Sequence, residues 1–257
     1  MPLQLALDEV LLNTMVPVLS VPGLTIASTY EPGTLSTGTP LIRFYFSDSP
    51  WVSLGYSKRG FKRSYAYAQH PRDDFKNWSA YPTVRRITGG GRVFHKDDII
   101  FSIVAPKEAD ESFMSVRMSY LKIHEAVKLA FESCGMNTRF YRCDENLPKG
   151  EDCFQFPIAT DLAFGKKKVA GGAQKRTRGV MLHQESIAPP EKMEALAFIE
   201  KLKIAFAKVF FVELAPADLD IAWMNQAKRL AKDKYETGKD PESEELMEMA
   251  ESLDERA

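Results

Sequence analysis

The sequence predicts an α+β fold with a mixed, mostly antiparallel sheet flanked by helices. Strand-like segments come first along the chain, strong helical patterns follow, and the two then alternate. The apolar run Ile99 to Ala105 reads as a buried strand. Apolar side chains from Val116 to Cys134, and again from Phe198 to Phe210, repeat at helical spacing. With 257 residues and 44% apolar side chains, the chain is long enough to bury a sizeable core.

The first part of the chain combines one helix with several strands. Apolar side chains from Leu3 to Leu11 repeat at helical spacing and predict an amphipathic helix. Prolines and glycines interrupt the segment from Pro17 to Pro40. Leu41 to Phe46 and Trp51 to Leu54 are strand-like and are joined by the turn SDSP. The polar and basic segment Lys58 to Tyr81 is expected to form an irregular loop that carries a short helix.

The apolar stripe that begins at Val116 predicts a helix that ends at Gly135, a residue typical of helix C-termini. Cys134 belongs to this stripe, so we expect it to be a core thiol. His124 lies beside the stripe, and we expect it on a solvated flank of the helix. Asn137 to Tyr141 reads as a short strand at the edge of the sheet.

A hairpin and two helices are expected in the rest of the chain. Leu162 to Phe164 and Lys168 to Ala170 are expected to pair across Gly165. The apolar side chains from Phe198 to Phe210 predict a helix whose apolar face packs against the core. A polar helix is expected over Ala217 to Tyr235.

Charge divides the chain into a body and a tail. Residues 233–257 contain ten acidic and three basic side chains, a net charge of −7, which leaves +6 on the rest of the chain. We therefore expect one domain over residues 1–232 and an acidic tail over 233–257 that is frayed helix or disordered. No apolar run approaches the ~20 residues that a membrane span requires. Three cysteines without CxxC spacing favour neither a disulfide framework nor zinc, and they fit a reducing cytoplasm.

The segment RRITGGGRVFH has the composition of a ligand-binding loop. Three consecutive glycines would allow a ligand to lie against main-chain N–H groups. Two arginines at its start can each form a fork onto a carboxylate or phosphate, and one of them is expected to face the ligand. A mobile hinge beside two surface arginines is the alternative. The candidate contact residues are Arg85, Arg86, Gly89, Gly90, Gly91 and His95.

A second basic segment, Asp161 to Ile187, contains no acidic residue between its first aspartate and Glu185. The small residues Gly171, Gly172 and Ala173 again permit close approach of a ligand to the backbone. A charge run of this kind is usually a solvated hairpin. One lysine differs from the others because it abuts two apolar residues and follows Cys153 by fifteen positions. The cations are Lys166, Lys167, Lys168, Lys175, Arg176 and Arg178.

These two segments carry a resemblance to a known family. RRxxGGGxVxH followed by a strand, and then KKVAGGAQ, resembles the lipoate and octanoate protein ligase/transferase family, whose relatives include biotin protein ligases. LALDEVLL and RFYFSDSPWVSLGY fit the same family, and the likeness covers about residues 3 to 210. The resemblance implies the biotin/lipoate ligase fold, which is related to class II synthetase cores, and a single catalytic domain.

Within that family, CFQFP upstream of the lysine is similar to the LipM-type octanoyltransferases. This likeness implies that Cys153 is the nucleophile that carries the acyl group and that Lys168 assists it. Cysteine is a good nucleophile only as a thiolate, and a nearby ammonium group favours the thiolate. The alternative role for Cys153 is that of a small buried hydrophobic residue.

Two departures from the transferase pattern keep other functions open. Transferases often carry an arginine at the position of Gly91, so the triple glycine is more similar to ATP-dependent lipoate ligases. In such a ligase, Lys168 and the glycine loop would hold a lipoyl adenylate, and ATP and Mg²⁺ would be required; the transferase needs no cofactor. Glu185 stands where the family usually has glycine, which bears on the local turn geometry. It is the one hint of a non-catalytic, carrier-binding homologue.

The partners implied by the resemblance are acidic carrier proteins. The donor would be acyl carrier protein, and the acceptor would be a lipoyl domain, as in glycine cleavage H protein or the acyltransferase subunits of 2-oxoacid dehydrogenases. The cations in Lys58 to Lys76 and Lys166 to Arg178 are suited to such partners. Nucleic acid and membrane partners are not expected, and the four histidines show no metal-ligand spacing.

Overall fold

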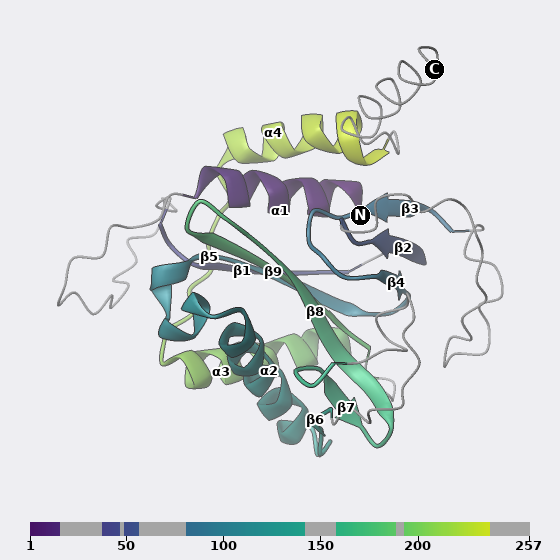
Figure 1. Cartoon of the computed structure of the whole chain (residues 1–257), viewed down its shortest axis with the longest axis vertical. Helices are drawn as coiled ribbons and strands as arrows, with labels where there is room; N and C mark the ends of the chain where they lie inside the picture. Colours follow the sequence, from purple (N-terminus) through teal and green to yellow (C-terminus); the bar gives the residue numbers. More distant parts are fainter. Residues whose placement is uncertain (16–37, 47–48, 57–80, 142–157, 189–192, 237–257) are drawn as a thin grey trace, which may run out of the picture.

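The computed structural model describes residues 1–15, 38–46, 49–56, 81–141, 158–188 and 193–236. A six-stranded, fully antiparallel sheet forms the centre (Figure 1). In spatial order its strands are β1 (Leu41–Tyr45), β5 (Ile99–Pro106), β9 (Val180–Ile187), β8 (Lys167–Thr177), β7 (Leu162–Phe164) and β6 (Arg139–Phe140). A smaller sheet contains β3 (Thr83–Arg85), β2 (Trp51–Leu54) and β4 (Arg92–His95), with β2 parallel to β3 and antiparallel to β4.

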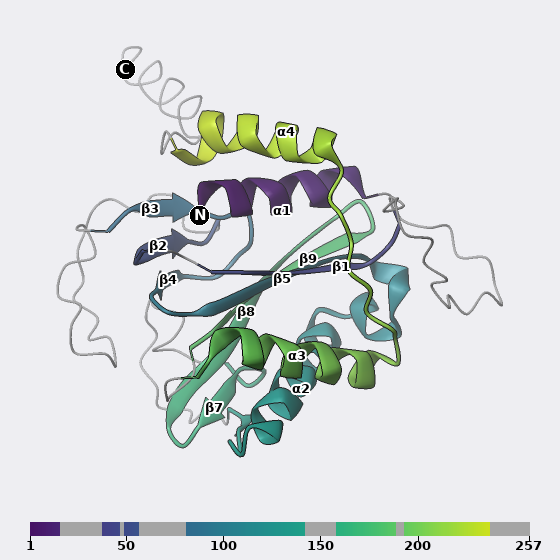
Figure 2. The ribbon, with the colours of Figure 1, turned by 180° about the vertical axis from the view of Figure 1, so that it is seen from behind.

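Helices cover both faces of the large sheet (Figure 2). Helix α1 (Pro2–Thr14) lies against one face and is itself covered by α4 (Ile221–Leu230), and α2 (Val116–Ser133) and α3 (Ala195–Phe210) cover the other. Two short 3₁₀ helices, η2 (Lys107–Ala109) and η3 (Glu111–Met114), connect β5 to α2. This architecture confirms the predicted mixed, mostly antiparallel sheet flanked by helices.

Strand β5 shows why the apolar run Ile99 to Ala105 is a strand rather than a helix. Every second side chain, including Phe101 and Ile103, packs against the core beneath α2 and α3. The intervening Ile100 and Val104 pack against the core beneath α1. Because side chains of a strand alternate between its two faces, only a strand buried on both sides needs an uninterrupted apolar sequence.

Capping side chains set the start of three helices. Ser115 accepts a hydrogen bond from a main-chain N–H of α2, Glu194 does the same for α3, and Asp220 does so for α4. The cap at Asp220 explains why the last helix begins at Ile221 and not at Ala217, where the sequence pattern begins.

The hairpin predicted across Gly165 is present, since β7 pairs with β8 and Gly165 adopts a φ of +60°. Strand β6 lies at the edge of the large sheet, as predicted. The segment RRITGGGRVFH is not a loop over its whole length as expected. It begins at the end of β3 and ends in β4, and only the residues between these strands form a loop. The predicted strands at Leu41 and Trp51 belong to different sheets and do not pair with each other. The segment Lys58 to Tyr81 lies outside the described residues, apart from Tyr81.

Two predictions about α2 are wrong. Cys134 is exposed because it is the C-cap residue, where the chain has left the helical turn that would have carried its side chain inward. His124 is fully buried, since α2 is enclosed by the large sheet on one side and by α3 on the other. Its buried face is therefore wider than the apolar stripe.

The first part of the predicted acidic tail belongs to the packed body. A π-helical turn, Ala231–Glu236, continues α4. Tyr235 is buried and its hydroxyl donates to Glu9 of α1, and the ammonium group of Lys234 pairs with Glu9 at 3.0 Å. Residues 237–257 lie outside the described part of the chain. Within the described residues, no helix has the length and apolar character needed to cross a membrane.

Candidate active site

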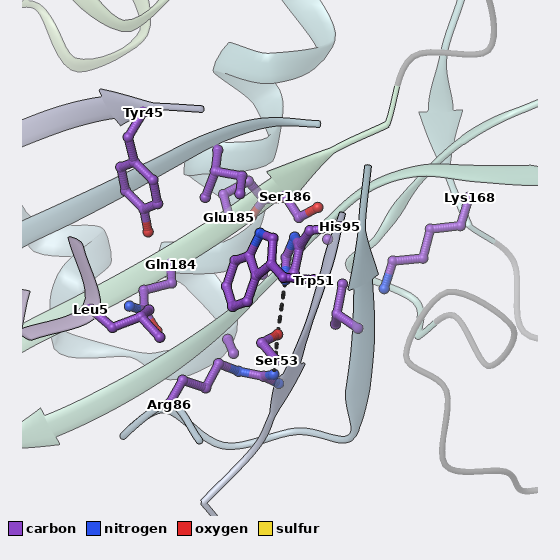
Figure 3. A pocket seen from close by; sticks show the side chains of 15 residues that line it. Leu5, Tyr45, Trp51, Ser53, Arg86, His95, Lys168, Gln184, Glu185 and Ser186 are labelled. Carbon is purple, nitrogen blue, oxygen red and sulfur yellow. Dashed lines mark hydrogen bonds between the residues drawn. The ribbon is translucent and has the colours of Figure 1, made fainter. Parts of the chain in front are cut away.

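A pocket lies where the small sheet meets the face of the large sheet that α1 covers (Figure 3). Both glycine-bearing segments contribute to its wall, together with β2 and β9. The sequence-predicted residues that line it are Arg86, His95, Lys168, Gly171, Gly172 and Ala173. Arg85 and the three glycines Gly89, Gly90 and Gly91 are not among the lining residues in the described part of the chain. The structure thus brings together six of the ten predicted site residues that it describes.

Arg86 fixes the shape of the glycine loop from within. Its guanidinium donates to the carbonyl oxygens of Gly89 at 2.8 Å and Gly91 at 3.0 Å, and also to Ser53 Oγ at 2.9 Å. Arg85 is only half-buried and donates to the carbonyl oxygen of Gly55 at 3.3 Å. The two arginines therefore differ in role, because only Arg86 reaches the pocket.

A glycine directly after β2 permits a close contact with the main chain of this loop. A Cβ atom on Gly55 would lie 2.0 Å from the carbonyl oxygen of Gly90, so a side chain at Gly55 would require the loop to move. Gly90 itself has a φ of +89°, a conformation that favours glycine. Gly55 and Gly90 therefore have reasons to be glycine that do not depend on a ligand, whereas a Cβ atom on Gly89 would meet no atom within 4 Å.

Lys168, on strand β8, is one of the residues that line the pocket. Its ammonium group pairs with Asp161 Oδ2 at 2.8 Å, and both side chains are about 95% buried. A Cβ atom on Gly171 would lie 2.2 Å from Lys168 Cε and 2.3 Å from Nζ. Gly171 therefore provides the space that the end of the lysine occupies. Lys166 and Lys167 are exposed, as expected.

His95 is held on three sides. Its ring stacks on Trp51 with 4.2 Å between centroids, Nε2 lies 2.9 Å from Ser53 Oγ, and Nδ1 lies 3.2 Å from Asp98 Oδ2. Burial lowers the pKa of His95, and the positive charge of Arg86 acts in the same direction against the opposing effect of Asp98. The imidazole is therefore neutral at pH 7.

Strand β9 carries two different polar networks on its two faces. Gln184 and Ser186 face the pocket, where they bond to Thr88 and Asp98. The neighbouring Glu185 points the other way, toward α2. The sequence suggested that a glutamate in place of the family's usual glycine would affect a turn. The structure instead places Glu185 within strand β9, where there is no turn.

Glu185 accepts hydrogen bonds from two buried histidines. Its Oε2 lies 2.9 Å from His124 Nε2 and 2.8 Å from His183 Nε2. Burial disfavours the carboxylate, but the positive charge of His124 and these hydrogen bonds outweigh it and lower the pKa of Glu185 to about 2. Burial also opposes the charge on His124, yet Glu185 raises the pKa of His124. A Cβ atom on Gly172 would lie 2.4 Å from the same carboxylate oxygen, so Gly172 makes room for it.

This trio is also the one group of possible metal ligands found among the described residues, with ligand atoms within 4.8 Å of one another. The hydrogen bonds argue against a metal. Arg176 donates to Gln174 Oε1, so the Gln174 amide nitrogen donates to His183 Nδ1 at 3.0 Å. His183 must then carry its proton on Nε2, where a metal would need a lone pair. The cluster is a buried hydrogen-bond network in which His183 donates to Glu185 and accepts from Gln174.

Cys153, the predicted nucleophile, lies outside the described residues, as does Cys143. Sequence reasoning missed three polar side chains of the site, namely Asp161, Ser53 and Asp98. In the sequence, Asp161 was noted only as the first residue of the basic segment, and nothing indicated that it pairs with Lys168. Asp98 follows His95 by three positions, a spacing that a search for histidine–carboxylate pairs could have found. Ser53 lies within a short strand-like segment, and no motif in that segment indicated a role in a site.

Most of the chain, including both segments that form the pocket, matches a known protein family. The family described as Lipoyl protein ligase A/B catalytic domain matches residues 4–197, well over half of the chain. The chain belongs to this family. The lipoyl protein ligase family thus accounts for the resemblance drawn from the two glycine-bearing segments, both of which fall within the matched residues.

Curated relatives in the family include proteins named Octanoyltransferase LipM. The one from Kyrpidia tusciae is 33% identical over 165 residues, which cover 61% of this chain and 57% of the relative. The one from Staphylococcus aureus is 31% identical over 195 residues, covering 71% of this chain and 68% of the relative. For several of these relatives the chain spans only a little over half of their length, 57%, 55% and 54%.

Solved structures confirm the fold. Lipoate-protein ligase A bound with ATP superposes with a TM-score of 0.63 at 17% identity, covering 91% of this chain and 90% of the other. A bi-partite lipoate protein ligase from Thermoplasma acidophilum gives a TM-score of 0.60 at 18% identity, covering 91% and 88%. The predicted biotin/lipoate ligase fold is therefore correct.

Proposed function

We propose that this protein is an octanoyltransferase of protein lipoylation, which moves an octanoyl group from acyl carrier protein to a lysine of a lipoyl domain. The acyl group would pass through a thioester on Cys153, without a cofactor, in the cytoplasm. The observation that carries the proposal is Lys168, which matches the family's lysine and extends, buried, into a pocket lined by backbone glycines. Relatives named Octanoyltransferase LipM support the choice of acyl group.

Each half of the reaction exchanges one acyl bond. The Cys153 thiolate would attack the donor thioester, forming a new C–S bond as the carrier thiolate leaves. The acceptor amine would then attack the enzyme thioester, forming an amide and releasing the Cys153 thiolate. In both halves negative charge develops on the carbonyl oxygen and on sulfur, and the ammonium group of Lys168 would stabilise it.

An ATP-dependent lipoate ligase is the second candidate, and the triple glycine is the observation that favours it. The structure supplies another reason for one of these glycines, because Gly90 has a φ of +89°, a conformation that favours glycine. Gly90 packs closely against Gly55. The ligase would catalyse pyrophosphate exchange that depends on lipoate, whereas the transferase would not. A non-catalytic carrier-binding homologue would show neither activity.

Intact-mass analysis tests the proposed thioester. After mixing with octanoyl-acyl carrier protein in the absence of ATP, we expect the wild-type protein to gain one octanoyl group and Cys153→Ala to gain none. Cys134→Ala and Cys143→Ala should gain the group like wild type. Near-normal transfer to a lipoyl domain by Cys153→Ala would reject the covalent mechanism and favour the ligase.

Salt should weaken the docking of the carrier substrate. Lys166, Lys167 and Arg178 are exposed on or beside β8, and acyl carrier proteins and lipoyl domains are acidic. Because exposed charges are screened beyond about 8 Å at physiological ionic strength, kcat/KM for the carrier should fall as salt rises. Truncation after Glu236, which keeps the contacts of Lys234 and Tyr235 with Glu9, tests whether the acidic tail competes for this surface. A salt-independent kcat/KM in both proteins would rule out charge-guided docking.

Replacing Gly171 with alanine should reduce transfer more than it reduces stability. The new methyl group would occupy the position of Lys168 Cε and Nζ, and the flexible lysine would have to withdraw. We expect the unfolding free energy to fall by about 1–3 kcal/mol, the usual cost of adding a methyl group to a packed site, which leaves the protein folded. Octanoyl transfer should fall clearly. Transfer at the wild-type rate would show that the position of Lys168 over Gly171 is unimportant.

A further inference from the structure

Three hydrogen-bonded side chains form a row that begins at the pocket wall, where Ser53 and His95 lie (Figure 3), and continues to Asp98 behind it. Ser53 of β2 lies 2.9 Å from Nε2 of His95 on β4, and the other ring nitrogen lies 3.2 Å from Asp98. All three residues are at least 95% buried, and Ser53 and His95 line the pocket directly. Trp51 covers one face of the imidazole.

The hydrogen bonds fix where each proton of this row lies. Asp98 accepts from the hydroxyl of Ser186 at 2.7 Å and therefore acts as a carboxylate, which leaves the proton on His95 Nδ1. His95 Nε2 is then an acceptor. Arg86 donates to Ser53 Oγ at 2.9 Å, so the hydroxyl proton of Ser53 is directed to His95. A hydroxyl that donates to a neutral imidazole, which in turn donates to a carboxylate, can pass a proton inward.

Lys168 is poorly placed to accept a proton in the same pocket. Its ammonium group is already engaged in an ion pair with the buried carboxylate of Asp161 at 2.8 Å. Amide formation nevertheless releases a proton from the attacking amine, and a group in the pocket must take it.

We propose that Ser53, His95 and Asp98 form the proton acceptor for the attacking amine, with Ser53 as the relay, His95 as the base and Asp98 as a positioning residue. This inference rests on the proposed function. The acceptor lysine enters as a neutral amine, its nitrogen bonds to the thioester carbonyl carbon, and the C–S bond breaks. One proton of that nitrogen passes to Ser53 Oγ while the Ser53 proton passes to His95 Nε2. The Cys153 thiolate is the leaving group, and His95 later returns its proton to solvent.

Strand pairing places this row and Lys168 at the same part of the pocket. Ser186, which donates to Asp98, pairs directly with Gly171. Residues directly opposite one another in an antiparallel pair face the same side of the sheet. The end of Lys168 occupies the space above Gly171, so the lysine and Asp98 lie on either side of this residue pair.

The base should act over a range that extends below pH 6.5, because burial lowers the pKa of His95 from that value. Two charged groups lie next to the imidazole and the hydroxyl of the row: its own member Asp98 at the ring, and Arg86 at Ser53. Lys168 and Tyr45 line the same pocket, and Glu185 belongs to its lining while its carboxylate points toward His124 and His183. Asp98 raises the pKa of His95, so Asp98→Asn should move the acidic limb of the transfer rate to lower pH. An asparagine also holds the imidazole less firmly in the required tautomer, so the maximum rate should fall as well.

The test separates loading of the enzyme from transfer. Each variant is first mixed with octanoyl-acyl carrier protein and its mass gain is measured, and a lipoyl domain is then added and the octanoyl group followed onto it across a pH series. For His95→Gln and Ser53→Ala we expect loading within about threefold of wild type and transfer slower by about 100-fold, the usual contribution of a general base. Ser119→Ala, which removes a buried hydroxyl from the network near α2, should transfer like wild type.

Several results would overturn the relay. One is wild-type transfer from loaded His95→Gln, and another is an acidic limb that Asp98→Asn leaves unmoved; this second readout remains if His95→Gln fails to fold. Equal losses in loading and transfer would assign the row a structural role. An octanoyl ester on Ser53, resistant to neutral hydroxylamine, would make Ser53 a nucleophile. Failure of the wild-type protein to load would instead reject the proposed function, and the relay with it.

Discussion

Glu185→Ala is expected to lower the free energy of unfolding by about 3–5 kcal/mol, the cost typical of breaking a buried ion pair. The side chains of Glu185 and His124 are both fully buried, and His183 donates to the same carboxylate oxygen. Alanine would leave two imidazole N–H groups in the core without an acceptor and would open a cavity beneath Gly172. Urea unfolding monitored by circular dichroism measures the loss. Glu200→Ala on the exposed face of α3 should stay within about 0.5 kcal/mol of wild type.

Glu185→Gln separates the charge from the hydrogen bonds. An amide can accept from His183 and donate to a neutral His124, so we expect a smaller loss than for alanine. The pKa of Glu185 falls from 4.5 to about 2 on folding, so its contribution is present above pH 4.5 and is lost as the pH falls toward 2. The pKa of His124 rises above 6.5, so its contribution is present below pH 6.5 and is lost as the pH rises through the folded-state value.

The stability difference between wild type and Glu185→Gln should therefore be largest between pH 4.5 and 6.5 and should shrink on both sides. Urea titrations at a series of pH values measure this difference. A difference that is constant with pH would show that the pair is not ionised in the folded protein.

Lys168→Met should reduce octanoyl transfer by about 100-fold or more, the effect typical of removing a group that stabilises developing charge. Lys167→Met, the matched control, should remain near wild type because Lys167 is exposed and points away from the pocket lining. Single-turnover transfer measures both. Comparable losses in the two variants would mean that general positive charge on β8, and not the placement of Lys168, matters.

Loss of Lys168 also leaves Asp161 buried without its ion-pair partner, so stability must be separated from activity. Lys168→Met alone should lower the unfolding free energy, and Lys168→Met combined with Asp161→Asn should recover part of that loss. Activity should not recover in the double variant. If activity does return with stability, Lys168 supports the fold and has no role in the chemistry.

Sequence patterns predicted the fold well where local periodicity and burial agree. The run from Ile99 to Ala105 is buried on both faces, so its continuous apolar character could come only from a central strand or a buried helix, and its length favoured the strand. The hairpin across Gly165 was predicted because the required turn needs a residue that tolerates positive φ. The small sheet was missed in part, since β3 and β4 flank glycines and are only three and four residues long.

The polar part of the site was much harder to predict, and the reason is that its partners are distant in sequence. Glu185 lies 61 positions from His124, and no local pattern reports that pairing. The helical stripe around His124 marks only apolar side chains, so a buried charged residue on the same helix face appears solvated. Lys168 could be singled out because its apolar neighbours and its family motif are local.

The alternation of β9 restricts how the pocket can be redesigned. Ser186 serves the pocket, while Glu185, its neighbour in the chain, anchors the core beneath the sheet. A one-residue shift of this strand would exchange the two side chains and leave each in the wrong environment. Substitutions intended to reshape the pocket are therefore best placed on other elements that line it, such as Leu5 of α1 and Tyr45 of β1, because they leave the alternation of β9 unchanged.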